Sequence, residues 1–545
     1  MASLEQKFEE ACDARDIPGV VLLASNGKGG FKYEKAFGPR NDLGEKVDLD
    51  TTFIMASCTK LMTSIAAMQC VERGLLSLDE DISRILPELK DVQIIKEAEP
   101  GKEIVYQKSQ TALTLRHLLT HTSGLGYDML DPRYHAWRAS RGESPGLWAI
   151  PILSRISTPI LFEPGTSWVY GTSLDWVGVA VARLNNITLE AFMEANIWTP
   201  LGIKDITFHQ EAKPAVKSNL VKMTVRKGIP NQGFPIPMMP VDTGEGVEFT
   251  DETLYDDPTA DEYGGAGGIG SAVEYMKILD SLLVSDGKLL RSETIDEMFK
   301  PQLSSDVAEA MQKNVDQPMY KDGLGNPPSG TRLNHGLGGM IMMENIETGR
   351  NKGTMAWSGL PNLLWSIDKE KRLNLMYASN VLPFGDYKSG EMQRLFETEM
   401  YKRFEEMSGL ALGDMAALGS NFSWEFLGTK SLPEQIFSHV SVIQGIYVNG
   451  RIYKFHVVCI PHRLALQLGP FEGRVKEASG GILAYESVTI DNQQFLPVGL
   501  YERARIAPYV HVGGESLIAC RTETRSLSAH VRWLGNPVDS ISRDS

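Results

Sequence analysis

The most constraining stretch of this chain is residues 53–74, where a short extended run leads into a long apolar helix. Ser57 and Lys60 stand three apart at the start of that helix, so their side chains share one face about one turn apart. A serine hydroxyl is a weak nucleophile until a nearby base takes its proton, and Lys60 can be that base if its surroundings favour the neutral amine. The positive potential of a helix N-terminus also favours negative charge developing on Ser57. The spacing therefore predicts a nucleophile and its base at the buried end of a central helix.

The Ser-x-x-Lys pattern alone is weak, because it occurs four times in the chain. The other matches are Ser25/Lys28, Ser285/Lys288 and Ser366/Lys369. The first two open glycine-containing turns, and the third runs from a strand into a charged turn. Only Ser57 stands at a strand-to-helix junction before a long apolar helix. A simpler interpretation, that Ser57 only caps this helix, stays open at this level.

Composition excludes several classes of protein. The net charge of −15 argues against nucleic acid as a partner. No stretch approaches the roughly 18 apolar residues of a membrane span, so no membrane partner is expected. The N-terminal residues are charged and lack the apolar core of a signal peptide, which predicts a cytoplasmic protein.

Metal and disulfide chemistry are not indicated. The five cysteines are scattered and show no CxxC spacing. His117 and His121 are four apart and could share a metal, but the His-Glu-x-x-His pattern and a third ligand are both absent. We expect them to be structural histidines, with no metal and no cofactor.

Length and charge predict two domains. A chain of 545 residues exceeds one typical hydrophobic core. Acidic residues outnumber basic ones 58 to 42 in residues 1–420, whereas residues 421–545 hold 12 basic and 11 acidic residues. We therefore predict a catalytic domain over 1–415, with insertions at about 90–110 and 213–258. Residues 421–545 are predicted to form a small β-rich module of unknown role, and the hairpin signal Asn449-Gly450 supports its strands.

The order of predicted elements gives the fold class. A helix at 3–14 and a hairpin over 20–37 open the chain, and a long helical middle follows. Strands between 335 and 378 and a helix at 387–406 close the first domain. This order predicts an α+β fold in which both chain ends build one antiparallel sheet flanked by helices, with a helical subdomain between them.

Three further motifs follow Ser57-x-x-Lys60 in a fixed order. Tyr170 lies in a loop just before a helix, a place where side chains face clefts. Residues 264–271 read Gly-Gly-Ala-Gly-Gly-Ile-Gly-Ser, which lacks the ending of a phosphate loop and predicts tight backbone packing. Trp357-Ser-Gly-Leu360 ends a late strand. Taken alone, Tyr170 and Trp357 are each better explained as packed core aromatics than as site residues.

Together with Leu115–Leu125, these motifs resemble the class C β-lactamase-like serine hydrolases over about residues 5–410. Within them the chain is most similar to fungal polyketide acyltransferases and transesterases of the lovastatin acyltransferase type. Ser-x-Thr-Lys-Leu followed by Ala-x-Gln-Cys-Val-Glu-Arg-Gly, and Trp-x-Gly-Leu-Pro-Asn, carry the closer likeness. The resemblance implies a β-lactamase/transpeptidase-like fold for this part of the chain.

The resemblance also implies residue roles. Ser57 would be the acylated nucleophile, and Lys60 and Tyr170 would share the roles of base and proton shuttle. The backbone N–H groups of Ser57 and Leu360 would hold the oxyanion, contributing on the order of 3 kcal/mol each. Trp357, Ser358, Gly359 and Thr172 would contact the substrate.

Two departures from the β-lactamase pattern change the expected substrate. The late strand carries Trp357-Ser358-Gly359 in place of Lys-Thr-Gly, so the cation that binds a substrate carboxylate is missing. The Tyr-x-Asn motif reads Tyr170-Gly-Thr172 and lacks its amide. Both disfavour β-lactam and peptidoglycan chemistry, and an apolar aromatic at Trp357 suits a neutral acyl group or acceptor.

The resulting hypothesis is a serine acyltransferase. Ser57 takes an acyl group from a thioester or ester, and a hydroxyl of a polyketide-type secondary metabolite receives it. The donor would be a small thioester such as an acyl-CoA, or an acyl group on a carrier protein. Two alternatives remain: an esterase with water as acceptor, and a binding protein whose segment 421–545 docks a partner.

Overall fold

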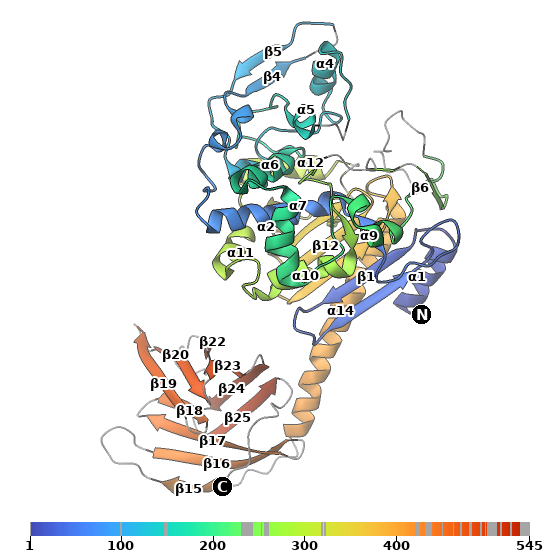
Figure 1. Ribbon diagram of the computed structural model, residues 1–545. Coiled ribbons are helices and arrows are strands. Elements are labelled where there is room, and N and C mark those ends of the chain that lie inside the picture. The colour runs from blue at the N-terminus through green and yellow to red at the C-terminus, as the bar shows by residue number, and fades with distance from the viewer. Residues whose placement is uncertain are drawn as a thin grey trace. The chain divides into compact units, whose positions relative to one another are not determined.

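The computed structural model in Figure 1 describes residues 2–419 apart from 99–100, 147–150, 230–242, 252, 255–260, 318–319 and 321–322. Beyond residue 419 it describes the strands between 426 and 534. The chain divides into two compact units, Met1–Glu405 and Glu406–Ser545. Among the described residues, no helix is both long and apolar enough to cross a membrane.

An antiparallel sheet from both chain ends organises the first unit, as predicted. Its strand order is β2-β1-β13-β12-β11-β10-β9, and β1 pairs with β13 so that Val21 faces Ala378. The strands are β1 (Val20–Ser25), β2 (Lys32–Phe37), β9 (Leu333–His335), β10 (Met340–Met342), β11 (Met355–Gly359), β12 (Leu363–Asp368) and β13 (Leu373–Ala378). The first and last parts of this unit therefore form one sheet across the whole intervening chain.

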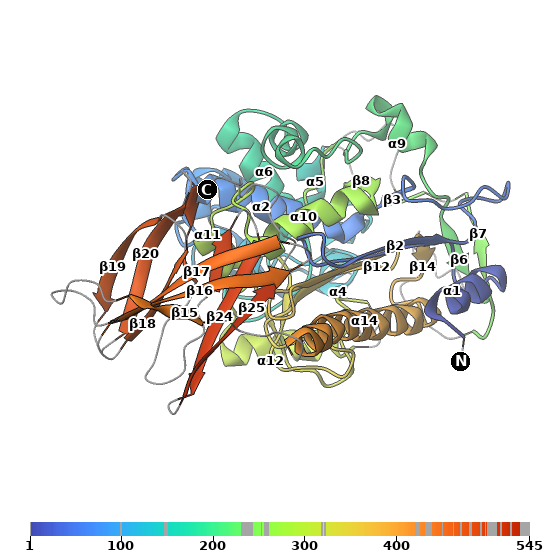
Figure 2. The same cartoon turned by 90° about the horizontal axis from the view of Figure 1, so that it is seen from below.

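Helices cover both faces of the sheet, which explains why β1 is buried along its whole length. Alternate side chains of a strand point to opposite faces. Leu22 packs with Phe8 of α1 (Leu4–Asp13) and Phe396 of α14 (Tyr387–Gly419). Leu23, on the other face, belongs to the main core with α2 (Thr59–Glu72) and α10 (Ala272–Val284). Figure 2 shows α1 and α14 on one side of the sheet and α2 and α10 on the other.

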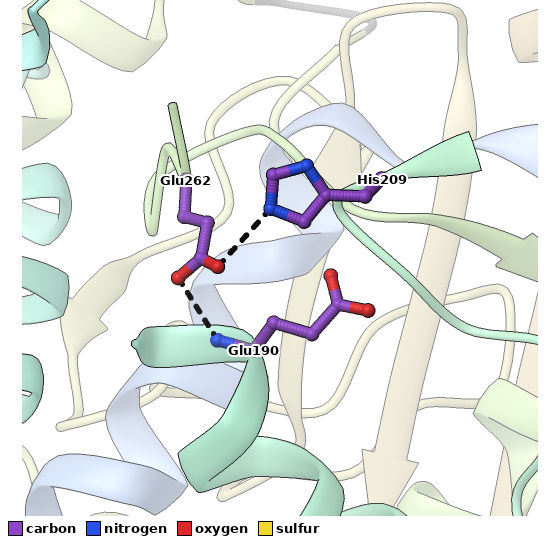
Figure 3. A group of neighbouring side chains, drawn as sticks. All are labelled: Glu190, His209 and Glu262. Carbon is purple, nitrogen blue, oxygen red and sulfur yellow. Dashed lines mark hydrogen bonds and ion pairs between the residues drawn. The ribbon is translucent and has the colours of Figure 1, made fainter. Parts of the chain in front are cut away.

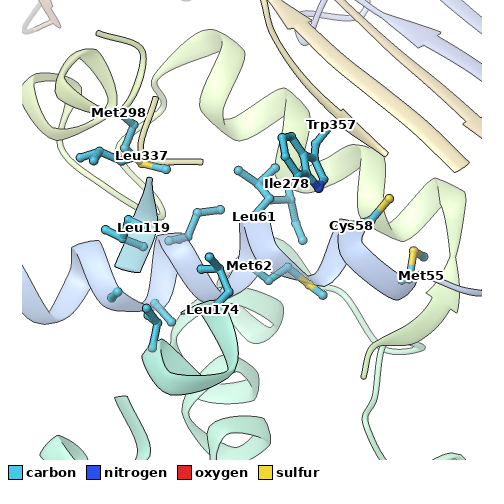
Figure 4. Packing of buried hydrophobic residues seen from close by; sticks show 14 of the residues in the cluster. Met55, Cys58, Leu61, Met62, Leu119, Leu174, Ile278, Met298, Leu337 and Trp357 are labelled. Carbon is cyan, nitrogen blue, oxygen red and sulfur yellow. The ribbon is translucent and has the colours of Figure 1, made fainter. Parts of the chain in front are cut away.

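Helix α2 lies inside this core. Every residue from Thr59 to Cys70 is buried, which fits a helix that is apolar on all sides and central to a domain. Leu61 and Met62 belong to one buried cluster with Leu119, Leu174 and Ile278, and Figure 4 shows these side chains around the helix. The long apolar helix predicted within residues 53–74 is α2.

The helical middle of the unit packs around α2. Its helices are α3 (Leu115–Leu119), α4 (Pro132–Ser140), α5 (Ile152–Ile156), α6 (Ser173–Asn185), α7 (Leu189–Met193), α8 (Thr199–Leu201), α9 (Pro214–Ser218), α11 (Ser292–Met298) and α12 (Ser305–Val315). Two short sheets accompany them, one pairing β3 (Thr52–Ile54) with β8 (Ile269–Ser271) and one ordered β14 (Val381–Leu382), β6 (Thr224–Arg226) and β7 (Val247–Phe249).

The segment 90–110 differs from its prediction as an irregular insertion. It forms an antiparallel hairpin of β4 (Gln93–Glu97) and β5 (Val105–Lys108). Ile94 and Ile95 are buried and anchor the hairpin, while all four residues of β5 are exposed. Strand β5 has no buried face, and the pairing was not predicted because strand patterns in a sequence depend on such a face.

The second unit is built from antiparallel sheets, in line with the predicted β-rich module. One orders β15 (Phe426–Lys430), β16 (His439–Val448), β17 (Arg451–Ile460) and β18 (Arg463–Leu468). A second orders β19 (Phe471–Ala478), β20 (Ile482–Ile490) and β21 (Gln493–Phe495), and a third β22 (Pro497–Val498), β23 (Tyr509–Val512), β24 (Glu515–Glu523) and β25 (Ser526–Leu534). The turn Asn449-Gly450 lies outside the described residues, although Val448 pairs with Arg451 on either side of it. Helix α14 runs through the predicted domain boundary as far as Gly419, and that boundary stays a prediction.

The central position of α2 generates a stability prediction. Leu61→Ala removes a fully buried side chain from close-packed surroundings, and we expect it to lower the free energy of unfolding by about 3 kcal/mol. Leu43→Ala is the matched control, because Leu43 is 84% exposed and its loss should change little. Denaturant unfolding of both variants measures the difference, and equal stabilities would contradict the central placement of α2.

Candidate active site

Ser57 lies in a sharp turn between β3 and α2. The preceding residue, Ala56, has a φ of +42°, a conformation that non-glycine residues adopt at a cost. The Met55 N–H donates to the Gly268 carbonyl at 2.9 Å, and the Cys58 N–H donates to the Met55 carbonyl at 3.0 Å. These bonds hold the strained turn and leave Ser57 half-buried, as the first partly accessible residue after the buried strand.

The Ser57 hydroxyl is bound by both predicted partners. Lys60 Nζ donates to Ser57 Oγ at 3.1 Å, and the Tyr170 hydroxyl donates to it at 2.6 Å. Lys60 Nζ also lies 4.7 Å from the centre of the Tyr170 ring. Cys58, not Ser57, is the N-cap of α2, and no side chain caps that end. The interpretation of Ser57 as a helix cap is therefore wrong.

Lys60 is buried, with all of its donor capacity used. Besides Ser57, its Nζ donates to the Gly265 carbonyl at 2.7 Å and to the Tyr127 hydroxyl at 3.2 Å. An ammonium carries three donors, and a buried one costs free energy unless they are paired. The site therefore holds a lysine in one fixed position beside the serine.

Tyr127 is the site residue that sequence reasoning missed. It lies in the loop after α3, and its ring meets the Tyr170 ring edge-on at 5.4 Å. Burial, together with nearby Tyr170 and Asp175, raises the pKa of Tyr127 well above its ordinary value, so it stays a neutral phenol. No local pattern distinguishes this tyrosine from other loop aromatics.

The glycine-rich segment 264–271 packs its backbone directly against α2, as predicted. Thr63 Oγ1 donates to the Gly264 carbonyl at 2.6 Å, and the Gly268 N–H donates to Thr59 Oγ1 at 2.9 Å. A Cβ on Gly268 would lie 2.8 Å from Thr59 Oγ1. Ser271 caps α10 by accepting from the Glu274 N–H.

Strand β11 reaches the same turn from the other side. A Cβ on Gly359 would lie 2.5 Å from the Met55 carbonyl, so only glycine permits this approach. Ser358, Leu360 and Thr172 line the cavity in front of Ser57. The side-chain oxygens of Ser358 and Thr172 are buried and have no partner among the described residues.

Trp357 lies behind this cavity, although it was expected to contact the substrate. Because side chains alternate along a strand, Trp357 faces the side opposite to Ser358. Its indole is 2% exposed, stacks on the His121 ring at 6.1 Å, and lines a second, smaller cavity with Lys60 and His335. The alternative interpretation of Trp357 as a core aromatic describes this position better.

His121 belongs to the same buried cluster. Its ring contacts the rings of Trp168, Tyr170 and Trp357. Burial holds the pKa of His121 well below its ordinary value, and burial lowers the pKa of His335 to about 4. Both rings are therefore neutral near pH 7, and the His121 ring meets the Tyr170 ring edge-on at 5.0 Å.

The cavity in front of Ser57 encloses about 810 Å³ of space, part of it open to solvent. Its wall is largely apolar and aromatic, with Leu130, Tyr320 and Phe384 among its residues. Asp175 is the one carboxylate in the wall, and no lysine or arginine of the described residues lines it. The site therefore suits a neutral, apolar group beside a polar nucleophile.

A second group of titratable side chains lies apart from this cavity. Glu190, His209 and Glu262 each place one potential ligand atom within 4.8 Å of the others (Figure 3). Protein groups already engage them: Glu262 accepts from His209 Nε2 at 3.1 Å and from the Glu190 N–H at 3.0 Å. Glu190 accepts from Thr207 Oγ1 at 2.7 Å. This arrangement ties α7 to the segment that leads into the glycine-rich stretch.

Comparison with known proteins agrees with this geometry. The Beta-lactamase family model matches residues 4–398. Monacolin J acid methylbutanoyltransferase from Aspergillus terreus is 33% identical, over 74% of this chain and 96% of that protein. A lovastatin esterase from Penicillium rubens is also 33% identical, over 74% of this chain and 100% of that protein. The unliganded structure of simvastatin synthase from Aspergillus terreus covers 74% of this chain and 99% of its own at a TM-score of 0.67 and 31% identity.

The His209 group predicts a pH-dependent contribution to stability. Burial acts to lower the pKa of His209, but the hydrogen bond to Glu262 and the charges of Glu190 and Glu211 raise it above the ordinary value. A raised pKa in the folded state stabilises fully below the unfolded value of about 6.5 and is lost as pH rises through the folded value. His209→Gln should therefore lower the free energy of unfolding more at pH 6 than at pH 9.

Chemical denaturation at the two pH values measures this difference. The exposed His135 supplies the control, since its Nε2 contacts only the Met129 carbonyl and His135→Gln should cost little at either pH. Equal losses for His209→Gln at pH 6 and pH 9 would rule out a charged His209 in the folded protein.

Proposed function

The chain belongs to the Beta-lactamase family, and from its site we propose a serine acyltransferase that works through an acyl group on Ser57. The observation that carries this proposal is the double hydrogen bond to Ser57 Oγ, from Lys60 and from Tyr170, at the mouth of an apolar cavity. The likeness to monacolin J acid methylbutanoyltransferase and ML-236A carboxylate methylbutanoyltransferase supports acyl transfer, and we infer a hydroxyl of a polyketide-type secondary metabolite as the acceptor.

Acylation needs the Ser57 proton to leave as its oxygen attacks. Lys60 enters this step as the neutral amine: Ser57 Oγ forms a bond to the acyl carbon, and its proton passes through the Tyr170 hydroxyl to Lys60 Nζ, which becomes the ammonium. When the tetrahedral intermediate collapses, the bond to the leaving group breaks and the pair returns the proton to the departing thiol or alcohol. The 2.6 Å contact between the Tyr170 hydroxyl and Ser57 Oγ supports Tyr170 as the proton shuttle, and the contacts of Lys60 with both residues support its role as the base.

The developing oxyanion needs donors that are already in place. We assign this role to the backbone N–H groups of Ser57 and Leu360, which contribute on the order of 3 kcal/mol each. The approach of β11 to the Ser57 turn supports this assignment, because Gly359 lets the strand end reach the Met55 carbonyl. Outside the helices and strands, no described hydrogen bond uses the Leu360 N–H, so that group is available.

The cavity wall supports a neutral, apolar acyl group. The described wall holds no cation that would bind a substrate carboxylate, and its only charged group is the carboxyl of Asp175. The unpartnered hydroxyls of Ser358 and Thr172 are suited to bind polar atoms of the substrate. We infer a thioester or ester donor, either a CoA derivative or an acyl group on a carrier protein.

Transfer proceeds when an alcohol replaces the leaving group. The acceptor hydroxyl loses its proton to the same pair, attacks the acyl carbon, and releases Ser57 with its proton restored. Hydrolysis is the second candidate, because water can take the acceptor's place. The 33% identity to a lovastatin esterase supports hydrolysis as this second candidate.

Mass spectrometry tests the acyl-enzyme. Incubation with a short-chain acyl thioester should add one acyl group to the wild-type protein and none to Ser57→Ala. Ser285→Ala is the matched control, since Ser285 and Lys288 repeat the sequence pattern but end helix α10 and its turn. An adduct of unchanged yield on Ser57→Ala, or none on the wild type, would overturn the proposal.

Product partition separates the two candidate reactions. With a hydroxylated polyketide at millimolar concentration, we expect transfer to exceed hydrolysis, because the apolar cavity favours binding of the alcohol over water. Chromatography of ester product against free acid gives the ratio. Free acid as the main product at every acceptor concentration would favour the esterase.

A further inference from the structure

Asp175 is a buried carboxylate to which the proposed reaction assigns no role. It lies in the first turn of α6 and is 2% exposed. Carboxylates are rarely buried so completely without a partner, because removing their charge from water is costly. Its Oδ1 accepts one hydrogen bond, from the Gly265 N–H at 2.8 Å.

Gly265 connects this carboxylate to the catalytic lysine. Its N–H donates to Asp175, while its carbonyl accepts from Lys60 Nζ at 2.7 Å. A Cβ at this position would lie 2.8 Å from Asp175 Oδ2 and 2.9 Å from Oδ1, so the carboxylate packs directly against the glycine backbone. The position of the carbonyl that binds Lys60 thus depends on Asp175.

The charges of Asp175 and Lys60 add to the contact that Gly265 makes between them. Burial raises the pKa of Asp175 to about 6, and the charge of Lys60 together with the Gly265 N–H acts in the opposite direction. Three other titratable groups face Lys60: Tyr127 and His121, which stay neutral, and Tyr170, whose ring centre lies 4.7 Å from Lys60 Nζ. Near pH 7 the carboxylate is therefore mostly ionised, and it is the one anion in the described cavity wall that can balance the lysine.

A purely structural role for Asp175 in α6 would not explain its burial. Acidic residues in the first turn of a helix stabilise it through the helix dipole, and Asp175 holds such a position in α6. That effect does not require burial, since an exposed carboxylate gives it without the cost of desolvation. The contact with Gly265 and the proximity of Lys60 explain the burial instead.

We propose that Asp175 is a positioning residue for Lys60. It holds Lys60 in place through the backbone of Gly265, and its buried negative charge stabilises the ammonium form of Lys60. The proposal rests on the proposed roles of Ser57 and Lys60. In this role Asp175 sets the pH range in which Lys60 can accept the serine proton. It touches neither the acyl carbon nor the nucleophile.

The test is the pH dependence of Ser57 acylation in Asp175→Asn. The amide keeps an acceptor for the Gly265 N–H but removes the charge, so the Lys60 ammonium should lose its proton at lower pH. We expect the acid limb of the acylation rate, measured by single turnover of p-nitrophenyl butyrate from pH 5 to 9, to move about one pH unit lower. The KM for the ester should stay within about twofold, because the change acts on the base and not on ester binding.

Asp280→Asn is the matched control. Asp280 is another buried carboxyl with a raised pKa, but its partners are Ser25 and Asn374, away from the cavity. Its variant should keep the wild-type midpoint. Gly265→Ala disturbs the same link from the other side, and its effect on the midpoint should not add to that of Asp175→Asn.

The outcomes separate the two proposals. A midpoint in Asp175→Asn equal to that of the wild type, with only the plateau reduced, would overturn the positioning role and leave the acyl-enzyme intact. A raised KM with an unchanged acylation midpoint would also overturn it, because Asp175 would then act on the substrate. Absence of acylation in the wild type would overturn the proposed function and this inference together.

Discussion

The hydrogen bonds of the buried Lys60 side chain are the interactions on which the site depends. Its Nζ contacts Ser57 Oγ, the Tyr127 hydroxyl and the Gly265 carbonyl, which come from three separate parts of the chain. Leaving any of them unpaired in this apolar surrounding would cost on the order of 1–3 kcal/mol or more. Packing of α2 on all sides and the close approach of the glycine-rich segment are what make this complete set of partners possible.

The same requirement explains the backbone chemistry around the site. Gly265 lies between Lys60 and Asp175, and Gly359 lies against the Met55 carbonyl. In both places a side chain would separate groups that must touch. The strained Ala56 turn then presents Ser57 to a cavity whose described wall holds no cation. The fold therefore shapes this site more through close contacts of backbone segments than through side-chain packing.

Sequence alone predicted the parts of this site that are local or ordered along the chain. Ser57 and Lys60 share one helix turn, and Tyr170 precedes α6, so both features have a local signal. The antiparallel sheet followed from hairpin and strand patterns at the two chain ends. Strand patterns also predicted strands between residues 335 and 378, where β12 and β13 lie.

Long-range contacts account for what sequence did not predict. The face on which Trp357 lies depends on the register of β11, which the motif Trp-Ser-Gly-Leu does not specify. Tyr127 has no local signal, because its hydrogen bond is to Lys60, which lies 67 residues away in the sequence. Asp175 does carry a weak signal, a lone acid in the apolar run Leu174-Asp-Trp-Val177, but its partner Gly265 becomes visible only in the folded chain.

The central claim is that Ser57 is acylated in a site whose oxyanion donors are the N–H groups of Ser57 and Leu360. A crystal structure after reaction with an alkyl fluorophosphonate tests it most directly, because the phosphonyl group mimics the tetrahedral intermediate. The account predicts phosphorus bonded to Ser57 Oγ, with one phosphonyl oxygen about 3 Å from both backbone nitrogens and the alkyl chain in the apolar cavity. Phosphorus on any other residue, or a phosphonyl oxygen directed away from those two nitrogens, would contradict it.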